Sequence, residues 1–312
     1  MPNDVCVILN PRAGHGAARD VRAQVTDSLR AAGVAFDLLE TERPGHATEL
    51  ALTARANGHT VVGAVGGDGT VNEVINGLAP LARNGEPAGR LALFPIGTGN
   101  DFADMLGSSR DFAQIAANIA AGRTRRVDLG RITLTPPQGE PVVRYFGNNV
   151  GLGFEAQVTL ESYKIRRING PLRYIIAVFW ALRHYRAPLV DLAWQRNDGE
   201  WQQRRQYSLL VSVGNSRRTG GAFFMTPDAV MDDGLLDIAL AKSIPILGIL
   251  RLLPKVLRAA HRHDPAIEFA RAAQIRFACD STVPVHLDGE VVMSDAKRAE
   301  IELLPGGLEV VL

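Results

Sequence analysis

The sequence is poor in cysteine, in net charge and in long apolar runs. Cysteine occurs only as Cys6 and Cys279, outside any CxxC pair or Cys/His cluster, which excludes a disulfide framework and a structural zinc site. The 34 Lys and Arg side chains nearly balance the 33 Asp and Glu side chains, which argues against nucleic acid as a partner. The longest uncharged apolar stretch, Tyr174 to Leu182, is too short to span a bilayer. We therefore expect a cytoplasmic protein without a transmembrane segment.

Several common motifs are also missing. The P-loop pattern GxxxxGK[ST] does not occur, and neither do HExxH and GxSxG. The segment Gly14 to Arg19 begins like GxGxxG but carries Arg19 in place of the third glycine. These absences exclude a Walker nucleotidase, disfavour a Rossmann dehydrogenase and remove the commonest signals of zinc proteases and serine hydrolases.

The chain changes its pattern part-way along. Roughly the first 125 residues alternate strand-like runs with helical patterns, which predicts βαβ units and a parallel sheet. The four strand-like runs are Val5 to Leu9, Ala35 to Leu39, Val61 to Val65 and Leu91 to Ile96. From about Val127 onward, alternating segments such as Tyr207 to Val213 predict a mostly antiparallel second domain.

Each of the four runs is followed by a loop that suits a phosphate group. The loops are Asn10 to Gly16, the segment at Thr41, Gly66 to Thr70 and Gly97 to Asp101. In a parallel α/β sheet such loops meet at the carboxyl edge, where glycines and helix N-termini favour anions. Thr70 and Glu73 also have the spacing of a capping box. The four loops together predict a nucleotide-phosphate site.

Asp68 stands in the middle of the glycine-rich GGDGT turn, where a carboxylate is costly unless it meets a cation or hydrogen-bond donors. A magnesium-nucleotide site supplies both. Here the sequence resembles the diacylglycerol kinase-like lipid kinases, which include bacterial diacylglycerol kinases, YegS-type kinases, sphingosine kinases and ceramide kinases. The resemblance is carried by GGDGTVNEVINGL from Gly66, PIGTGNDFA from Pro95, NNVGLGFEA from Asn148, GGAFFMTPDAVMDDGLLDIAL from Gly220 and HLDGE from His286.

The resemblance implies a fold of two domains. The first, residues 1–128, would be a nucleotide-binding α/β domain with a parallel sheet, to which residues 300–312 return. The second, residues 129–299, would be a β-sandwich-like domain for the lipid. By matching position, the expected ATP contacts are Asn10, Thr41, Gly66, Gly67, Asp68, Gly69, Thr70, Val71, Asn72 and Thr98.

The resemblance also implies the catalytic and metal-binding residues. Asp68 would organise the catalytic Mg²⁺, and Asp288 and Glu290 would activate the acceptor hydroxyl. The sequence does not decide between these two carboxylates, although we favour Glu290. Taken alone, Asp288-Gly289 is more typical of a hairpin turn than of a catalytic site. A second, structural Mg²⁺ would be held by Asp233 and the carbonyls of Val230 and Leu235, where the alternative is an ordinary Asp-Asp-Gly turn.

Two apolar segments contain interspersed basic residues and are candidates for contact with a membrane surface. They are Glu161 to Arg186 and Ile244 to His263. The alternative is that both are domain-packing helices with charged outer faces. A peripheral membrane protein is therefore expected, and a homodimer is among the oligomeric states considered.

These observations predict an ATP- and Mg²⁺-dependent lipid kinase that transfers the γ-phosphate to a lipid hydroxyl, with a diacylglycerol-type acceptor. One alternative is an NAD kinase-like nucleotide kinase, which shares GGDGT, although no GSTAY-like segment is found. The other is a catalytically idle nucleotide- or lipid-binding regulator. The retention of Asp68, Asp288 and Glu290 argues against that reading.

Overall fold

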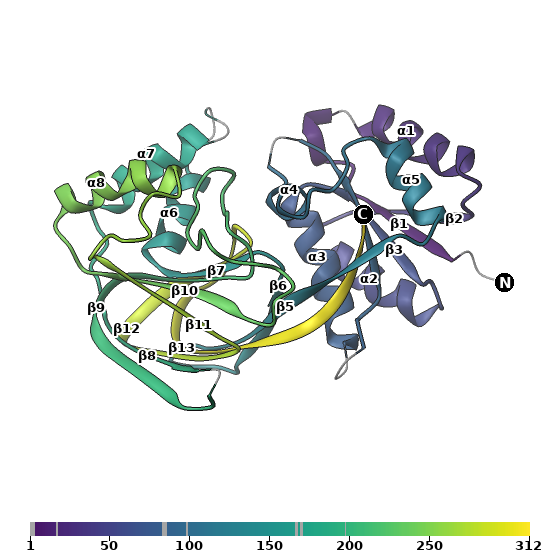
Figure 1. Ribbon diagram of the computed structural model, residues 1–312. Helices are drawn as coiled ribbons and strands as arrows, with labels where there is room; N and C mark the ends of the chain where they lie inside the picture. The colour runs from purple at the N-terminus through teal and green to yellow at the C-terminus, as the bar shows by residue number, and fades with distance from the viewer. Residues whose placement is uncertain are drawn as a thin grey trace. The chain divides into compact units, whose positions relative to one another are not determined.

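The computed structural model describes residues 4–16, 18–82, 86–97, 99–165, 168, 171–196 and 198–312. They form two compact units (Figure 1). Unit 1 contains the chain up to Leu129 together with Leu304–Leu312, and unit 2 contains Gly130–Leu303. The pairing of the strands confirms the predicted fold class, a parallel α/β first domain followed by a mostly antiparallel second domain.

Unit 1 is built on a parallel sheet. Its elements are β1 (Val5–Leu9), the 3-10 helix η1 (Ala13–Gly16), α1 (Ala18–Ala31), β2 (Phe36–Glu40), α2 (His46–Ala56), β3 (Val61–Gly66), α3 (Asp68–Leu78), the 3-10 helix η2 (Ala79–Leu81), β4 (Arg90–Pro95), α4 (Asp101–Leu106), α5 (Phe112–Ala120), the first part of β5 (Thr124–Thr135) and the last part of β13 (Glu290–Val311). The strands lie in the order β13, β4, β3, β1, β2, and each neighbouring pair is parallel. The C-terminal segment of the chain thus joins this sheet beside β4, and β13 also pairs with β5.

Helices cover both faces of the sheet in unit 1. Alternate residues of β1, namely Val5, Val7 and Leu9, pack with α1 and α5 in one apolar cluster. Helices α2 and α3 pack against each other on the opposite face (Figure 1). Gly77 of α3 allows this close approach, because a Cβ atom there would lie 2.4 Å from the carbonyl oxygen of Thr48.

The strand order places a switch point beside β1. The chain passes from β1 to β2 on one side and then returns past β1 to β3 on the other. Because all these strands are parallel, their carboxyl ends meet at one edge of the sheet, and the crevice outside β1 and β3 is the place where such folds bind ligands. The loops after β1, β2, β3 and β4 all lie at this edge.

Unit 2 is a two-layered antiparallel structure. Its elements are the second part of β5, β6 (Val142–Phe146), β7 (Asn149–Gly153), α6 (Phe154–Tyr163), α7 (Pro171–Ala181), β8 (Leu189–Gln195), β9 (Trp201–Gly214), β10 (Leu236–Lys242), α8 (Ile246–Leu257), β11 (Ile267–Ala272), β12 (Gln274–Leu287) and the first part of β13. The long strands β9 and β12 each pair with β8 through their first halves and with β7 through their second halves. Both long strands therefore connect β8 to β7 within the antiparallel part of the sheet.

Two apolar clusters stabilise unit 2. The larger lies between the strands and includes Phe146, Leu192, Val213 and Val285, all essentially buried. The smaller joins α6, α7 and α8 to the outer side of β9 and β10, as Figure 1 shows, through residues such as Phe154 and Ile249. Among the described residues, no helix combines the length and the apolar character that crossing a membrane requires.

A buried histidine in unit 1 gives a pH-dependent contribution to stability. His59 Nε2 lies 2.8 Å from Asp37 Oδ2, and His59 Nδ1 lies 2.9 Å from the carbonyl oxygen of Ala54. Both neighbours are acceptors, so only the doubly protonated ring donates to both. The hydrogen bond to Asp37 is the main reason that the pKa of His59 is raised above its ordinary value.

We expect unit 1 to lose stability as the pH rises. A histidine whose pKa is higher in the folded than in the unfolded chain stabilises the fold fully below its unfolded pKa of about 6.5, and this contribution disappears as the pH passes the folded pKa. Hydrogen exchange of the β1 and β2 amides, corrected for the intrinsic exchange rate, measures the effect between pH 5 and 9. Asp37→Asn should flatten the profile; an unchanged profile in that variant would contradict the assignment.

Candidate functional site

The GGDGT segment forms the turn between β3 and α3. Gly66 ends the strand, Gly67 is the N-cap and Asp68 is the first helical residue. Gly66 has to be glycine, since a Cβ atom there would lie 2.4 Å from Thr70 Oγ1. The first amides of a helix have no partner within the helix, so the Gly67–Thr70 turn presents N–H groups at the carboxyl edge of the sheet.

Asn10 links this turn to the loop after β1. Its Nδ2 donates to Thr70 Oγ1 at 3.0 Å, and its Oδ1 accepts from the backbone N–H of Arg12 at 3.0 Å. The structure therefore brings Asn10 and Thr70, two of the predicted nucleotide contacts, together across the switch point. Thr41 follows β2 at the same edge, where its N–H donates to the carbonyl of Leu9 at 2.9 Å.

Asp68 lies beside the loop after β4. Its Oδ1 accepts from Phe102 N, in the first turn of α4, at 3.4 Å, and a Cβ atom on Gly99 would lie 3.6 Å from its Oδ2. The carboxylate thus stands between two loops of the carboxyl edge and is only partly buried. Thr98, also predicted to contact the nucleotide, lies outside the described residues.

Val71 and Asn72, the remaining predicted nucleotide contacts of the motif, make hydrogen bonds within α3. The N–H of Val71 donates to the carbonyl of Gly67 at 3.1 Å and its side chain is buried, while Asn72 accepts from Asn76 through its carbonyl and side-chain oxygens. Of the predicted set, Gly67, Asp68, Gly69 and Thr70 are therefore the residues at the open end of the helix.

The predicted capping box of Thr70 and Glu73 is wrong. The carboxylate of Glu73 accepts from Gly45 N at 2.8 Å and from Ala47 N at 3.0 Å. It therefore caps the N-terminus of α2 rather than that of its own helix, because α2 packs directly on α3.

In unit 2, Asp288 and Gly289 form the two-residue turn between β12 and β13. Their φ angles are +50° and +88°, and Leu287 pairs with Glu290 across the turn. Positive φ at both central positions is the conformation of a type I′ hairpin turn. The backbone at Asp288-Gly289 is thus a hairpin turn, as the alternative interpretation predicts.

The Asp288 carboxylate accepts three backbone hydrogen bonds. Its Oδ2 accepts from Gly147 N at 3.0 Å, and its Oδ1 accepts from Asn148 N at 2.8 Å and from Asn149 N at 2.9 Å. These bonds fasten the start of β7 to the turn. Both oxygens of Asp288 are therefore engaged in holding the backbone.

Glu290 is the more accessible of the two acids. It is exposed, and its Oε2 accepts from the hydroxyl of Tyr163 at 3.2 Å. The same hydroxyl accepts from Val291 N at 3.2 Å. Burial and the nearby Glu290 charge raise the pKa of Tyr163 to about 12, so the phenol keeps its proton at neutral pH. Tyr163 thus fixes the position of the Glu290 carboxylate.

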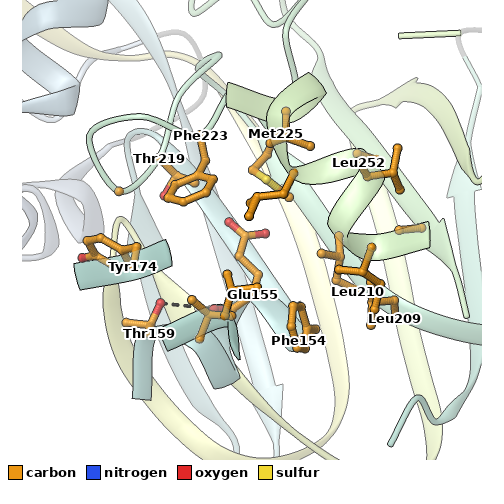
Figure 2. Close-up of a pocket in the computed structure, with 18 of the residues that line it drawn as sticks. Phe154, Glu155, Thr159, Tyr174, Leu209, Leu210, Thr219, Phe223, Met225 and Leu252 are labelled. Atoms are coloured by element: carbon orange, nitrogen blue, oxygen red, sulfur yellow. Dashed lines mark hydrogen bonds between the residues drawn. The ribbon is translucent and has the colours of Figure 1, made fainter. Parts of the chain in front are cut away.

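An apolar pocket lies within unit 2 beside this turn (Figure 2). Its walls come from α6, α7, α8 and β9, and the lining reaches Gly289. The apolar residues of the lining are Phe154, Val158, Tyr174, Val178, Leu209, Leu210, Phe223, Met225, Ala239, Ala241, Ile249, Leu252, Leu253, Val256 and Ile267. The polar members are Glu155, Thr159, Thr219, His261 and His286.

The side chains of Asn149, Glu155 and His286 meet at this pocket. Glu155 Oε1 accepts from Asn149 Nδ2 at 2.9 Å and lies 3.1 Å from His286 Nε2. His286 Nδ1 accepts from Gly289 N at 3.3 Å. Gly151 has to be glycine, because a Cβ atom there would lie 2.2 Å from His286 Nε2 and 2.7 Å from Glu155 Cδ.

The predicted structural metal site has a different arrangement. Asp233 Oδ1 accepts from Leu235 N at 3.1 Å, and Asp233 Oδ2 pairs with the guanidinium of Arg271. The same guanidinium lies 3.3 Å from Asp237, whose burial raises its pKa to about 6. Among the described residues no group of three or more acidic, His or Cys side chains could hold a metal. The cation beside Asp233 in this arrangement is the Arg271 guanidinium.

Residues 4–132 match the family model of the diacylglycerol kinase catalytic domain, and residues 148–312 match that of the YegS C-terminal NAD kinase beta sandwich-like domain. A diacylglycerol kinase from Mycobacterium tuberculosis is 31% identical over 98% of this chain and 94% of its own length. The chain belongs to the diacylglycerol kinase family. The prediction of a lipid kinase is thereby confirmed.

Other relatives place the whole chain within the same family. A diacylglycerol kinase from Bacillus subtilis is 30% identical over 91% of this chain and 88% of its own length. The crystal structure of a diacylglycerol kinase from Bacillus anthracis superposes with a TM-score of 0.70 at 26% identity, covering 98% of this chain and 96% of that one. Yeast NADH kinase is similar in fold alone, with a TM-score of 0.57 at 12% identity, covering 100% of this chain and 84% of that one.

The sequence patterns assign no role to four residues that the structure places at this site: Asn149, Glu155, Tyr163 and His286. Asn149 and Glu155 belong to the NNVGLGFEA segment and His286 to HLDGE, so the family motifs contained them. Tyr163 had no motif to mark it. Their roles depend on how α6 packs on the β12–β13 turn, and sequence spacing does not report that.

We expect Asp288→Asn to destabilise unit 2. The amide keeps the turn conformation but removes the charge and one acceptor, and a hydrogen bond to a charged group contributes about 1.5–3 kcal/mol. Urea unfolding followed by the fluorescence of Trp180, Trp194 and Trp201, all in unit 2, should show a loss of about 1–3 kcal/mol. Asp191→Asn, which affects one surface bond to Gln203, is the matched control. Equal losses in the two variants would contradict the structural role of Asp288.

Proposed function

We propose that this member of the diacylglycerol kinase family transfers the γ-phosphate of ATP, with Mg²⁺, to the hydroxyl of a diacylglycerol-type lipid. The observation that carries the proposal is the apolar pocket of unit 2, whose lining ends at Gly289 in the Asp288–Glu290 turn. An apolar pocket suits acyl chains, and its end beside a carboxylate suits a reacting hydroxyl.

In unit 1, the Gly66–Thr70 turn and the loops after β1, β2 and β4 are the proposed ATP site. The N–H groups of the first turn of α3 and the positive end of the α3 dipole favour phosphate oxygens there. Asp68 would hold the Mg²⁺ ion, which binds through one or two carboxylates, phosphate oxygens and water, so a single partly buried carboxylate fits it. The ion would neutralise charge on the phosphates.

In unit 2, we assign the role of acceptor base to Glu290. Its carboxylate is exposed and is oriented by the Tyr163 hydroxyl, whereas the oxygens of Asp288 are bonded to three backbone amides. Asp288 holds the turn that presents Glu290. The structural Mg²⁺ at Asp233, with the carbonyls of Val230 and Leu235, stays a prediction, and it would require Arg271 to release Asp233.

For the membrane surface we propose α7 and α8. Both helices line the pocket and also expose large apolar side chains, Leu172, Phe179 and Trp180 on α7 and Ile246 and Leu247 on α8. Arg251 and Lys255 on α8 pair with Asp264 but remain partly exposed, so they can face anionic head groups. Residues 166, 167, 169 and 170 of the expected segment Glu161 to Arg186 lie outside the described residues.

The activity test is transfer of label from γ-labelled ATP to micelle-dispersed lipid alcohols, with NAD as a further acceptor. We expect label on diacylglycerol and a fall of at least about 10²-fold in Asp68→Ala, because charge neutralisation in the transition state is lost. Asp27→Asn, an exposed acid on α1, is the matched control. Label on NAD alone would overturn the lipid acceptor, and substantial residual transfer in Asp68→Ala would overturn the role of Asp68.

The docking surface is tested with Leu247→Glu. Leu247 is 80% exposed, so the substitution should leave the fold intact and reduce co-sedimentation with phosphatidylglycerol-containing vesicles several-fold, because it places a charge where burial in the lipid is expected. Phosphorylation of a soluble short-chain diacylglycerol should not change. Leu52→Glu, on α2 of unit 1 at 47% exposure, is the control. Equal vesicle binding by both variants would contradict the surface.

A further inference from the structure

Glu155 is a charged residue in a pocket whose walls are otherwise mostly apolar. Figure 2 shows its carboxylate among the pocket side chains, and the side chain is only 10% exposed. A carboxylate removed from water to this extent is costly unless each oxygen meets a donor.

Only one of the two oxygens meets that condition. Oε1 accepts from Asn149 Nδ2 at 2.9 Å, whereas Oε2 is buried and has no hydrogen-bond partner among the residues that the structure describes. The pocket thus contains an acceptor that the protein leaves unsatisfied.

His286 supplies the complementary group. Its Nδ1 accepts from Gly289 N at 3.3 Å, so the neutral ring carries its hydrogen on Nε2. Nε2 lies 3.1 Å from Glu155 Oε1 but makes no hydrogen bond within the described part of the chain, and His286 is 1% exposed. An unsatisfied N–H donor therefore lies next to the carboxylate group whose second oxygen, Oε2, is unsatisfied.

We propose that Glu155 and His286 together recognise a hydroxyl group of the lipid held in the pocket. A hydroxyl is both donor and acceptor, so it can donate to Glu155 Oε2 and accept from His286 Nε2–H at the same time. An ammonium group has no acceptor, and an ether or ester oxygen has no donor. The pair selects for an alcohol and thereby makes Glu155 and His286 specificity-determining residues.

The position of the pair relates this recognition to the β12–β13 turn. His286 is joined through Gly289 N to the turn that carries Glu290, so the recognised hydroxyl lies on the side of the pocket next to the proposed base. This inference rests on the proposed function in that the occupant of the pocket is taken to be a lipid.

The test measures binding without ATP, so that it does not depend on turnover. The full-length protein is titrated calorimetrically with 1-decanol, decyl methyl ether and decylamine. Because a hydrogen bond to a charged group contributes about 1.5–3 kcal/mol, we expect decanol to bind at least about tenfold more tightly than the ether. We expect decylamine to bind more weakly than decanol, since its ammonium cannot accept from His286.

Glu155→Gln is the decisive variant. In this variant the amide oxygen still accepts from Asn149 Nδ2, so the amide NH₂ group takes the place of Oε2. The pocket then has no acceptor at this position. Decanol and the ether should then bind equally, within about twofold. Val158→Ala, on the same helix and in the same lining, should change the affinity for both ligands alike and keep their ratio.

The outcomes separate this inference from the proposed function. Equal wild-type affinity for decanol and ether, together with normal transfer of phosphate to lipid, would overturn the hydroxyl recognition alone. No binding of any decyl compound and no transfer to lipid would overturn both. If Glu155→Gln does not fold, the wild-type ratio of the alcohol to the ether decides the proposal by itself.

Discussion

The carboxylate of Asp288 holds together the part of unit 2 in which we place the acceptor chemistry. By accepting from three consecutive amides, Gly147 to Asn149, it fastens the start of β7 to the β12–β13 turn. Strand β7 leads directly into α6. Both ends of α6 contact the region of the β12–β13 turn: Glu155 in its first turn lies beside His286, and Tyr163 at its last residue bonds to Glu290. An acid that keeps its geometry by accepting three backbone bonds is a poor base, which supports our proposal that Glu290 is the base.

The two units prepare their sites by different physical means. In unit 1 the proposed phosphate site relies on backbone amides at the edge of the sheet, on glycines that permit close approach, and on Asn10 and Thr70, which join two loops. In unit 2 the contacts come from side chains on packed helices and strands. A phosphate is recognised by many weak donors in a fixed array, whereas one hydroxyl on a flexible lipid needs a few well-placed groups in an apolar setting.

The sequence predicts the features that depend on local pattern and on general rules of topology. The four loops meet at one edge because parallel strands joined by helices put all their carboxyl ends together, and GGDGT therefore lies beside Asn10 as expected. The features it does not predict depend on contacts between distant segments. Glu73 caps a neighbouring helix, and Arg271 pairs with Asp233 from another strand. Neither partner can be identified from spacing along the chain.

The energetics of lipid transfer explain why unsatisfied polar atoms are useful in this pocket. An acyl chain that leaves a bilayer for an apolar cavity exchanges one hydrocarbon environment for another, so its burial contributes little net free energy to binding. Affinity and selectivity then have to come from polar groups. A buried acceptor on Glu155 and a buried donor on His286, neither of which has a partner among the described residues, lower the stability of the empty pocket. In our proposal they gain their missing bonds only when a hydroxyl binds. The free-energy cost of the unsatisfied atoms in the empty pocket is thus relieved by lipid alcohols and not by the far more abundant lipids that lack a free hydroxyl.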